Sequence, residues 1–285
     1  MSPSRLFTLT VLAVIAFAAN AVLCRLAFTR TGIDPASFTA IRLASGTLAL
    51  WLVVRRRGVR LRAGGNWRCA LALFAFAVAH TFGYVTVPAG AGTLLFCGAV
   101  QASMIFAALW AGERLAMHQS GGLALALGGL VILVLPGLSA PPLGGSALML
   151  AAGVAWGVYS LLGRGTADPA AATAGNFLRA TWLAVALGVA ALPWAQFDIT
   201  GVAYAVFTGV VFTGLGYAIW YAALPALSAT RAATVQLSVP VIAALGAVAL
   251  LHEPITLRLV VASAAVLGGS ALVIPGKQRV AGRAH

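Results

Sequence analysis

Charged residues are scarce in this sequence, and acidic residues are almost absent. Only 8% of the 285 residues are charged and five are Asp or Glu, whereas 61% are hydrophobic and the mean hydropathy is +1.00. A soluble protein could not cover its surface with so few charges, but a membrane protein presents apolar side chains to lipid. The shortage of charge therefore excludes an ordinary soluble domain and predicts an integral membrane protein.

The few carboxylates lie outside the long apolar runs. Asp34, Asp168 and Asp198 fall between runs, and Glu113 and Glu253 fall at the ends of runs. No carboxylate is expected at the membrane midplane, where a proton relay or an organic-cation site would need one. Neither a Ser-His-Asp arrangement nor an H-E-x-x-H motif is recognisable, so we predict that the protein is not an enzyme.

Cysteine is also rare. Cys24, Cys69 and Cys97 have no paired spacing and lie within or beside apolar runs. This pattern predicts small buried side chains and no disulfide or metal framework. We expect neither a metal site nor a cofactor.

Long apolar runs fill the rest of the chain. A run of about 17–25 residues can cross a hydrocarbon core as a helix. The sequence predicts an all-α integral membrane protein with ten transmembrane helices at 6–28, 36–54, 67–88, 91–111, 119–135, 144–163, 170–194, 200–224, 231–251 and 257–274.

The basic residues, which bring the net charge to +13, occur in short clusters between these runs. Such a distribution orients a membrane protein and does not predict a nucleic-acid partner. If the N-terminus is cytoplasmic, the arginine-rich loop 55–68 faces the anionic headgroups on that side, and only Arg30 and Arg258 lie on the other. Arginine far outnumbers lysine, as is typical of GC-rich bacteria. We predict a bacterial inner-membrane protein with both termini in the cytoplasm.

The second half of the sequence repeats the first. YVTVP at 84–88 is answered by YAALP at 221–225, and LGGLVILVLPG at 127–137 is answered by LGGSALVIPG at 267–276. An internal repeat constrains the fold more than a single motif does.

Each half carries five predicted helices. Because five is odd, a second half at 138–285 must insert upside down relative to a first half at 1–137. Inverted repeats are a transporter architecture, in which the substrate is held near the midplane where the halves meet.

Several motifs carry a resemblance to a known family. They are GERL at 112–115, Arg42, Trp156-Gly157 and PVIAAL from Pro240. With these, the chain resembles the drug/metabolite transporter superfamily, and in particular its ten-helix EamA-type permeases. The resemblance implies that helices 1, 3, 4, 6, 8 and 9 surround a cavity, that helices 5 and 10 pack at the periphery, and that small metabolites, amino acids or drugs are exported. The sequence departs from the usual pattern at Phe17-Ala18 and at His252-Glu253-Pro254.

Two pairs of polar aromatic residues are candidates for binding substrate. His80 and Tyr84 are four residues apart on one helix face, and an offset of 137 relates them to Tyr217 and Tyr221. The pairs are expected to face each other across a central cavity. The alternative is that the tyrosines anchor the membrane interface. His80 would carry the link if transport is coupled to protons, because it titrates near neutral pH.

Other polar residues within the runs extend this candidate site. Trp156 and Tyr159 are expected to line it, with Asn20 as the counterpart of Tyr159 at an offset of 139. Gln101 and Gln236 lie in the middle of helices, where a buried amide needs either a neighbouring helix or a substrate as partner.

Two arginines fall within predicted helices. Arg42 and Arg179 are candidates for a gate or for a contact with a charged substrate, because ionisable groups at such depth are costly. In the alternative, both extend towards the headgroups.

The sequence thus predicts a carrier that exports an amino acid, or a similar zwitterionic or neutral-aromatic solute, by alternating access. Two alternatives stay open. One is a transport-inactive membrane scaffold that associates through the glycines of GGLALALGG at 121–129. The other is a multidrug efflux carrier, which the missing midplane carboxylate disfavours. The oligomeric state stays open as well.

Overall fold

The computed structural model describes residues 2–56, 64–112, 115–137, 140–163, 166, 168–223, 226–227 and 235–273. Within these ranges the chain is helical and contains no strand. The helices are α1 Pro3–Arg30, α2 Pro35–Arg55, α3 Trp67–Tyr84, α4 Ala89–Trp110, α5 Met117–Val134, α6 Leu143–Leu162, α7 Pro169–Ala190, a short η2 Leu192–Trp194, α8 Ile199–Phe207, η3 Thr208–Leu215, α9 Gly216–Ala223, α11 Ser238–Leu251 and α12 Leu257–Val273.

The aspartates between apolar runs begin helices. Asp34 accepts a hydrogen bond from Ser37 N at 2.8 Å, and Asp168 accepts one from Ala171 N at 3.0 Å. In each case a proline follows at the first helical position, where its missing N–H costs nothing. Asp198 also caps a helix, α8, although no proline follows it. The backbone N–H groups that donate to its carboxylate, that of Gly201 most strongly, lower the pKa of this carboxyl.

A described helix lies in each of the ten predicted runs. Five of the helices are both long and apolar enough to cross a membrane: α1, α2, α4, α5 and α6. The eighth predicted run is not one regular helix, since α8 passes through the π-helical η3 into α9. The irregularity lies where Gly209 and Gly214 of η3 pack closely on α2, and a Cβ at Gly214 would come within 2.5 Å of Ala49 Cβ. A wider π turn at such a contact is a feature of functional sites.

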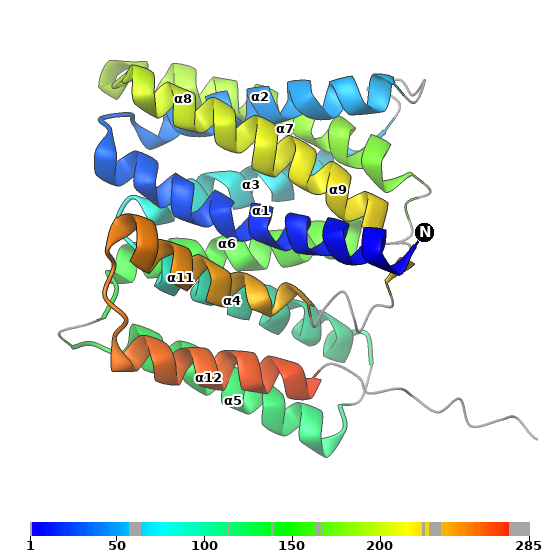
Figure 1. The fold of residues 1–285 in the computed structure, drawn as a ribbon, viewed down its shortest axis with the longest axis vertical. Coiled ribbons are helices and arrows are strands. Elements are labelled where there is room, and N and C mark those ends of the chain that lie inside the picture. Colours follow the sequence, from blue (N-terminus) through cyan, green and yellow to red (C-terminus); the bar gives the residue numbers. More distant parts are fainter. Residues whose placement is uncertain are drawn as a thin grey trace, which may run out of the picture.

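The helices lie side by side, with α5 and α12 together at one end of the bundle and α2, α7 and α8 at the other (Figure 1). The helices α5 and α12 correspond to the fifth and tenth predicted helices. Both lie at the periphery, as the resemblance implies. They pack on each other and contact the remaining helices chiefly through α4. Between the two ends, α1 packs on α11, α9 and η3, while α6 packs on α4 and α3.

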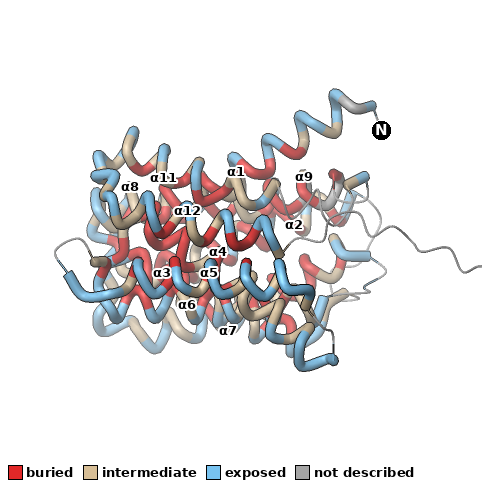
Figure 2. The backbone as a smooth tube through the Cα atoms, turned by 90° about the horizontal axis from the view of Figure 1, so that it is seen from below, coloured by how far each residue is buried: buried red, intermediate tan, exposed pale blue. Residues whose placement is uncertain are grey.

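Exposed residues lie along the outside of the bundle (Figure 2), and many of them have large apolar side chains. Trp110 is 94% exposed, and Phe7, Phe106 and Val131 are exposed as well. In water such an apolar surface would be a liability, but in a bilayer lipid covers it. The arrangement agrees with the membrane class predicted from composition.

Glycines set the distance between α5 and α12. A Cβ on Gly122 would lie 2.6 Å from Gly269 O, and one on Gly129 would lie 2.9 Å from Ala265 Cβ. Gly121, by contrast, has no neighbour within 4 Å. Half of the glycine pattern proposed for a scaffold therefore serves packing within this chain.

We expect Gly122→Ala to lower the stability of the protein by about 1–3 kcal/mol, because the new methyl group forces α12 away from α5. Gly121→Ala is the matched control: it gains the same helix propensity but meets nothing. Thermal unfolding of both variants in detergent measures the difference. Equal midpoints would show that the α5–α12 contact is not as close as described.

Candidate functional site

A chain of aromatic side chains in mutual contact runs between the helices. Neighbouring ring centroids are separated by 4.7 Å, between His80 and Tyr84, to 6.0 Å, between Phe17 and Trp220. We call this set the aromatic column. In order of contact its members are Tyr84, His80, Phe76, Trp156, Tyr217, Phe17 and Trp220, with Phe96, Tyr159 and Phe177 packed on its sides.

The column runs along α1. Near one end of the column, Ala13 of α1 packs in one apolar cluster with Trp220. Near the other end, Arg25 of α1 binds the main-chain oxygen of Tyr84. The twelve residues that separate Ala13 and Arg25 on α1 correspond to roughly 18 Å of helix. Both halves of the chain contribute side chains to the column, which is the placement expected for a central transport path.

The structure brings five of the predicted binding residues together. His80, Tyr84, Trp156, Tyr159 and Tyr217 all belong to the column, and Phe76 joins the first pair to Trp156 and so to Tyr217. The side chain of Tyr221 is outside the described residues.

Tyr84 is anchored more firmly than a freely exposed lining residue would be. It is 0% exposed, and its hydroxyl lies 2.9 Å from Thr93 Oγ1, which in turn donates to Ala89 O. Tyr159 pairs similarly with Thr173 at 3.3 Å. These contacts tie the column to the helices around it.

The three predicted amides lie in different surroundings. Asn20 is half-buried on α1, and its Oδ1 is enclosed without a hydrogen-bond partner among the described residues. Gln101 lines a crevice of about 10 Å³ between α4, α5 and α12, away from the column. Gln236 is exposed. Asn20 shares α1 with Phe17 of the column, whereas Gln101 shares α4 with Phe96 but lines the crevice towards α5 and α12.

The two intramembrane arginines also differ. Arg42 is 2% exposed, and its Nη2 donates to Ala77 O of α3 at 3.3 Å. Arg179 is half-buried and donates from Nη1 to Gly64 O and Gly175 O, both at 2.9 Å. Arg179 therefore holds the segment before α3 against α7, whereas Arg42 points into the centre of the bundle.

Phenylalanines complete the column, and the residue-type reasoning above did not single them out. Phe76 lies four residues before His80, which continues the same helix face that His80 and Tyr84 share. That spacing was the available signal. Phe17 stands where the resembled family often has tryptophan, and it contacts both Tyr217 and Trp220. No local pattern distinguishes Phe96 or Phe177 from ordinary apolar residues.

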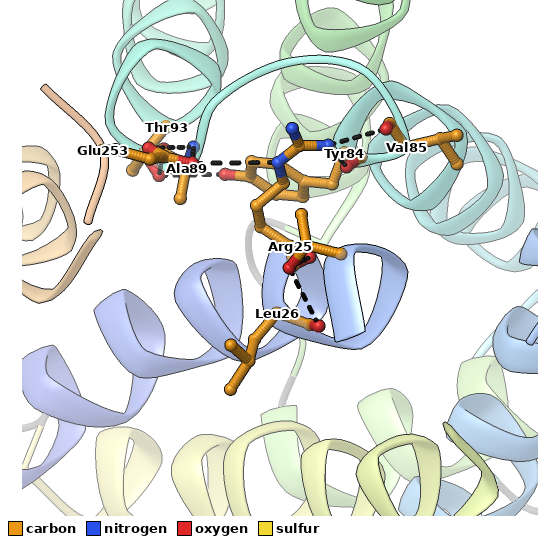
Figure 3. A network of polar contacts seen from close by, with 8 residues as sticks. Arg25, Leu26, Tyr84, Val85, Ala89, Thr93 and Glu253 are labelled. Carbon is orange, nitrogen blue, oxygen red and sulfur yellow. Dashed lines mark hydrogen bonds and ion pairs between the residues drawn. The ribbon is translucent and has the colours of Figure 1, made fainter. Parts of the chain in front are cut away.

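An ionic network joins helices at the Tyr84 end of the column (Figure 3). Arg25 Nη1 donates to Tyr84 O at 3.0 Å and to Val85 O at 2.6 Å, and its Nε lies 3.7 Å from Glu253 Oε1. Glu253 accepts from Ala89 N with both carboxylate oxygens, at 3.0 and 2.9 Å. The network joins α1, the α3–α4 turn and the α11–α12 turn, and it places a carboxylate at the N-terminus of α4, where the helix dipole favours it.

A left-handed residue brings Glu253 into this position. His252 caps α11 with a φ of 54°, a conformation that glycine usually supplies. Gly112, which the repeat places at the equivalent position of the first half, has a φ of 88°. The second half has His252-Glu253-Pro254 in place of Gly-Glu-Arg, but His252 keeps the left-handed backbone conformation of Gly112.

Comparisons with known proteins agree on one family. The sequence profile of the EamA-like transporter family matches residues 5–135 and again residues 143–274. A solved crystal structure with 19% identity superposes on 97% of this chain and 99% of its own, with a TM-score of 0.66, which supports the fold.

Three relatives match along most of their length. An uncharacterized protein of Pseudomonas aeruginosa is 52% identical over 96% of both chains. An uncharacterized transporter of Archaeoglobus fulgidus is 28% identical over 85% of this chain and 89% of its own. A protein of Streptantibioticus cattleyicolor, named a probable terminal-alkyne amino-acid exporter, is 30% identical over 84% of this chain and 85% of its own.

We expect Arg25→Gln to destabilise the protein by about 1 kcal/mol, because the carbonyls of the α3–α4 turn and the Glu253 carboxylate lose a charged partner. Arg30→Gln is the control, since Arg30 is exposed at the end of the same helix. Thermal unfolding in detergent compares the two variants. Identical midpoints would mean that the network contributes nothing to holding this end closed.

Proposed function

Since the chain belongs to the EamA-like transporter family of the drug/metabolite transporter superfamily, we propose that it exports an amino acid or a similar small solute by alternating access. Members of the family are multi-pass membrane transporters and not enzymes, which confirms the class predicted from the sequence. The substrate is accordingly a small molecule. The direction of transport, the substrate class and the mechanism are the proposal.

The observation that carries the proposal is the aromatic column and the unpartnered polar atoms on the helices that form it. His80 Nδ1, Thr81 Oγ1 and Asn20 Oδ1 are enclosed and have no hydrogen-bond partner among the described residues. Polar atoms buried in this way are costly for a protein that only packs helices. A transported solute would supply the missing partners, so transport is favoured over the scaffold alternative.

We propose that residues 1–137 and 138–285 are inverted repeats. The helix contacts support this, because exchanging each helix for its counterpart in the other half reproduces several of the main helix pairs. For example, α1 packs on α11 as α6 packs on α4, and α2 packs on η3 as α7 packs on α3. The two separate matches of the family profile support the same division.

In this arrangement both termini are cytoplasmic in the inner membrane of a bacterium, as the basic residues predict. The Arg25–Glu253 network then lies on the periplasmic side and closes it. Because the column side chains are packed against one another, a solute can pass only if the helices move apart. Release to the periplasm requires Arg25 to leave Glu253 and the α3–α4 turn.

The substrate class rests on two supports. The relative from Streptantibioticus cattleyicolor is named for amino-acid export, and the column offers aromatic faces to a small apolar side chain. Multidrug efflux of organic cations is less favoured. The four described carboxylates cap helices or belong to the Arg25 network, so none is placed to bind a cation in the column.

Flux in proteoliposomes tests transport directly. Vesicles containing the purified protein and loaded with labelled L-amino acids, the aromatic and aliphatic ones first, should lose label faster than protein-free vesicles. Release at the protein-free rate for every L-amino acid would contradict the proposed substrate class.

We expect Trp156→Ala to slow that flux by roughly tenfold, because each lost aromatic contact is worth about 0.5–1.5 kcal/mol and Trp156 joins both ends of the column. Trp182→Ala is the control, since Trp182 is 66% exposed on the outer face of α7. Folded protein is quantified by size-exclusion chromatography. If the two variants transport at equal rates, the column is not the path.

Fusions test the topology. A green fluorescent protein joined after residue 285 should fluoresce, because that end is expected in the cytoplasm. A phosphatase inserted at residues 138–142 should be active, because that loop is expected in the periplasm. The reverse pair of results would overturn the inverted arrangement.

A further inference from the structure

A buried arginine that has no acidic partner among the described residues lies beside the aromatic column. Arg42 is 2% exposed, and its guanidinium donates a hydrogen bond to Ala77 O at the long distance of 3.3 Å. Its Cζ also lies 5.9 Å from the centre of the Phe38 ring. A guanidinium has five N–H donors, and Ala77 O is the one acceptor that Arg42 reaches within the described residues, so most of its hydrogen-bonding capacity is left for another group.

The four described carboxylates have other partners. Asp34, Asp168 and Asp198 cap helices, and Glu253 binds Ala89 N and faces Arg25. The remaining one, Glu113, is outside the described residues. Within the part of the chain that the structure describes, no carboxylate forms an ion pair with Arg42. A buried charge in this situation is costly unless a ligand brings the opposite charge.

Polar groups that could share such a ligand come from the helices around Arg42. His80 and Thr81 follow Ala77 on α3, and His80 lies within electrostatic range of Arg42. His80 Nδ1 and Thr81 Oγ1 are buried and lack partners among the described residues. Arg42 is also within electrostatic range of Cys24, one turn after Asn20 on α1, and the Oδ1 of Asn20 lacks a partner too.

The chemistry of this set points to one kind of ligand. Guanidinium and hydroxyl groups donate hydrogen bonds to an anion, and a guanidinium binds a carboxylate with two parallel bonds. Asn20 Oδ1 is an acceptor and suits a neutral N–H or an ammonium, but it brings no charge to balance a cation. The site is therefore built around a negative charge, with acceptance of an amine as a secondary feature.

We propose that Arg42 binds the carboxylate of the transported solute, so that the protein requires a carboxylate and tolerates loss of the amine. The inference rests on the proposed transport function and narrows its substrate to carboxylic acids. The body of the solute would lie along the rings of His80 and Tyr84, which begin the column on the same helix. Esters, amides and amines of the same shape are poor ligands.

Binding of a matched set of compounds to the full-length protein in detergent tests this. The probes are L-phenylalanine, 3-phenylpropionate, L-phenylalaninamide and phenethylamine, which keep the ring and vary the two charged groups. The two acids should raise the unfolding midpoint of the wild type by about 2–4 °C at tenfold excess over Kd. The amide and the amine should have at least tenfold lower affinity and so a much smaller effect.

Substitutions assign the effect to the guanidinium. In Arg42→Gln both acids should lose their effect, and in Arg42→Lys they should keep part of it, because lysine retains the charge without the two parallel bonds. The control Arg30→Gln, at an exposed arginine, should respond as the wild type does. If Arg42→Gln does not fold, two comparisons still test whether the guanidinium binds the carboxylate. One compares the wild type with Arg42→Lys, and the other compares the acids with the amide.

Equal stabilisation of the wild type by the amide and the acids would overturn the proposal, as would an acid effect that persists undiminished in a folded Arg42 variant. The same four compounds in proteoliposomes separate this outcome from failure of the transport function. Acid binding without flux would support the anion site and contradict the proposed transport function. Flux of the amide or the amine, with no stabilisation by the two acids, would support transport and contradict the anion site.

Discussion

Hydrocarbon offers no hydrogen bonds, so each polar group within this bundle depends on a partner from the protein itself. The chain meets that constraint economically. Aspartates cap the helices they precede, the hydroxyl of Tyr84 pairs with Thr93, and Glu253 takes up the free N–H of Ala89 at the start of α4. Among the described residues, five buried polar atoms have no hydrogen-bond partner, and two of them, on His80 and Thr81, belong to the helix that Arg42 contacts. A polar atom costs the protein less where a passing solute completes its hydrogen bonds, so these two favour a binding site over ordinary packing.

Much of the fold could be predicted from the sequence because long apolar runs and Asp-Pro starts are local signals. Each of the ten predicted runs contains a described helix, and Asp34 and Asp168 cap helices whose first residue is proline. The π-helical η3 could not be predicted, because it lies where Gly209 and Gly214 pack closely on α2. This is a contact between segments far apart in the chain. The conformation of His252 was equally hidden, although Gly112 at the equivalent repeat position pointed to it.

The candidate site could be predicted only in part, because it too depends on contacts between segments far apart in the chain. The spacing of His80 and Tyr84, together with the repeat offset, predicted residues that the structure joins through Trp156. The position of Gln101 between α4, α5 and α12, and the exposure of Gln236, depend on how the helices rotate in the bundle, which a mid-helix position does not determine. Arg42 and Arg179 looked alike in the sequence. They differ because Arg179 reaches the backbone at Gly64, whereas Arg42 faces the interior.

The central claim is that solute passes along the aromatic column beside Arg42, and the native Cys24 can report on it. Cys24 is fully buried on α1 within electrostatic range of Arg42, so a variant with Cys69 and Cys97 replaced by serine leaves one thiol at the column. A membrane-impermeant thiosulfonate should label Cys24 slowly in cells at rest, faster while substrate is being exported, and more slowly again when a non-transported carboxylate is bound. Labelling that is absent in every condition, or that ignores substrate, would contradict the claim.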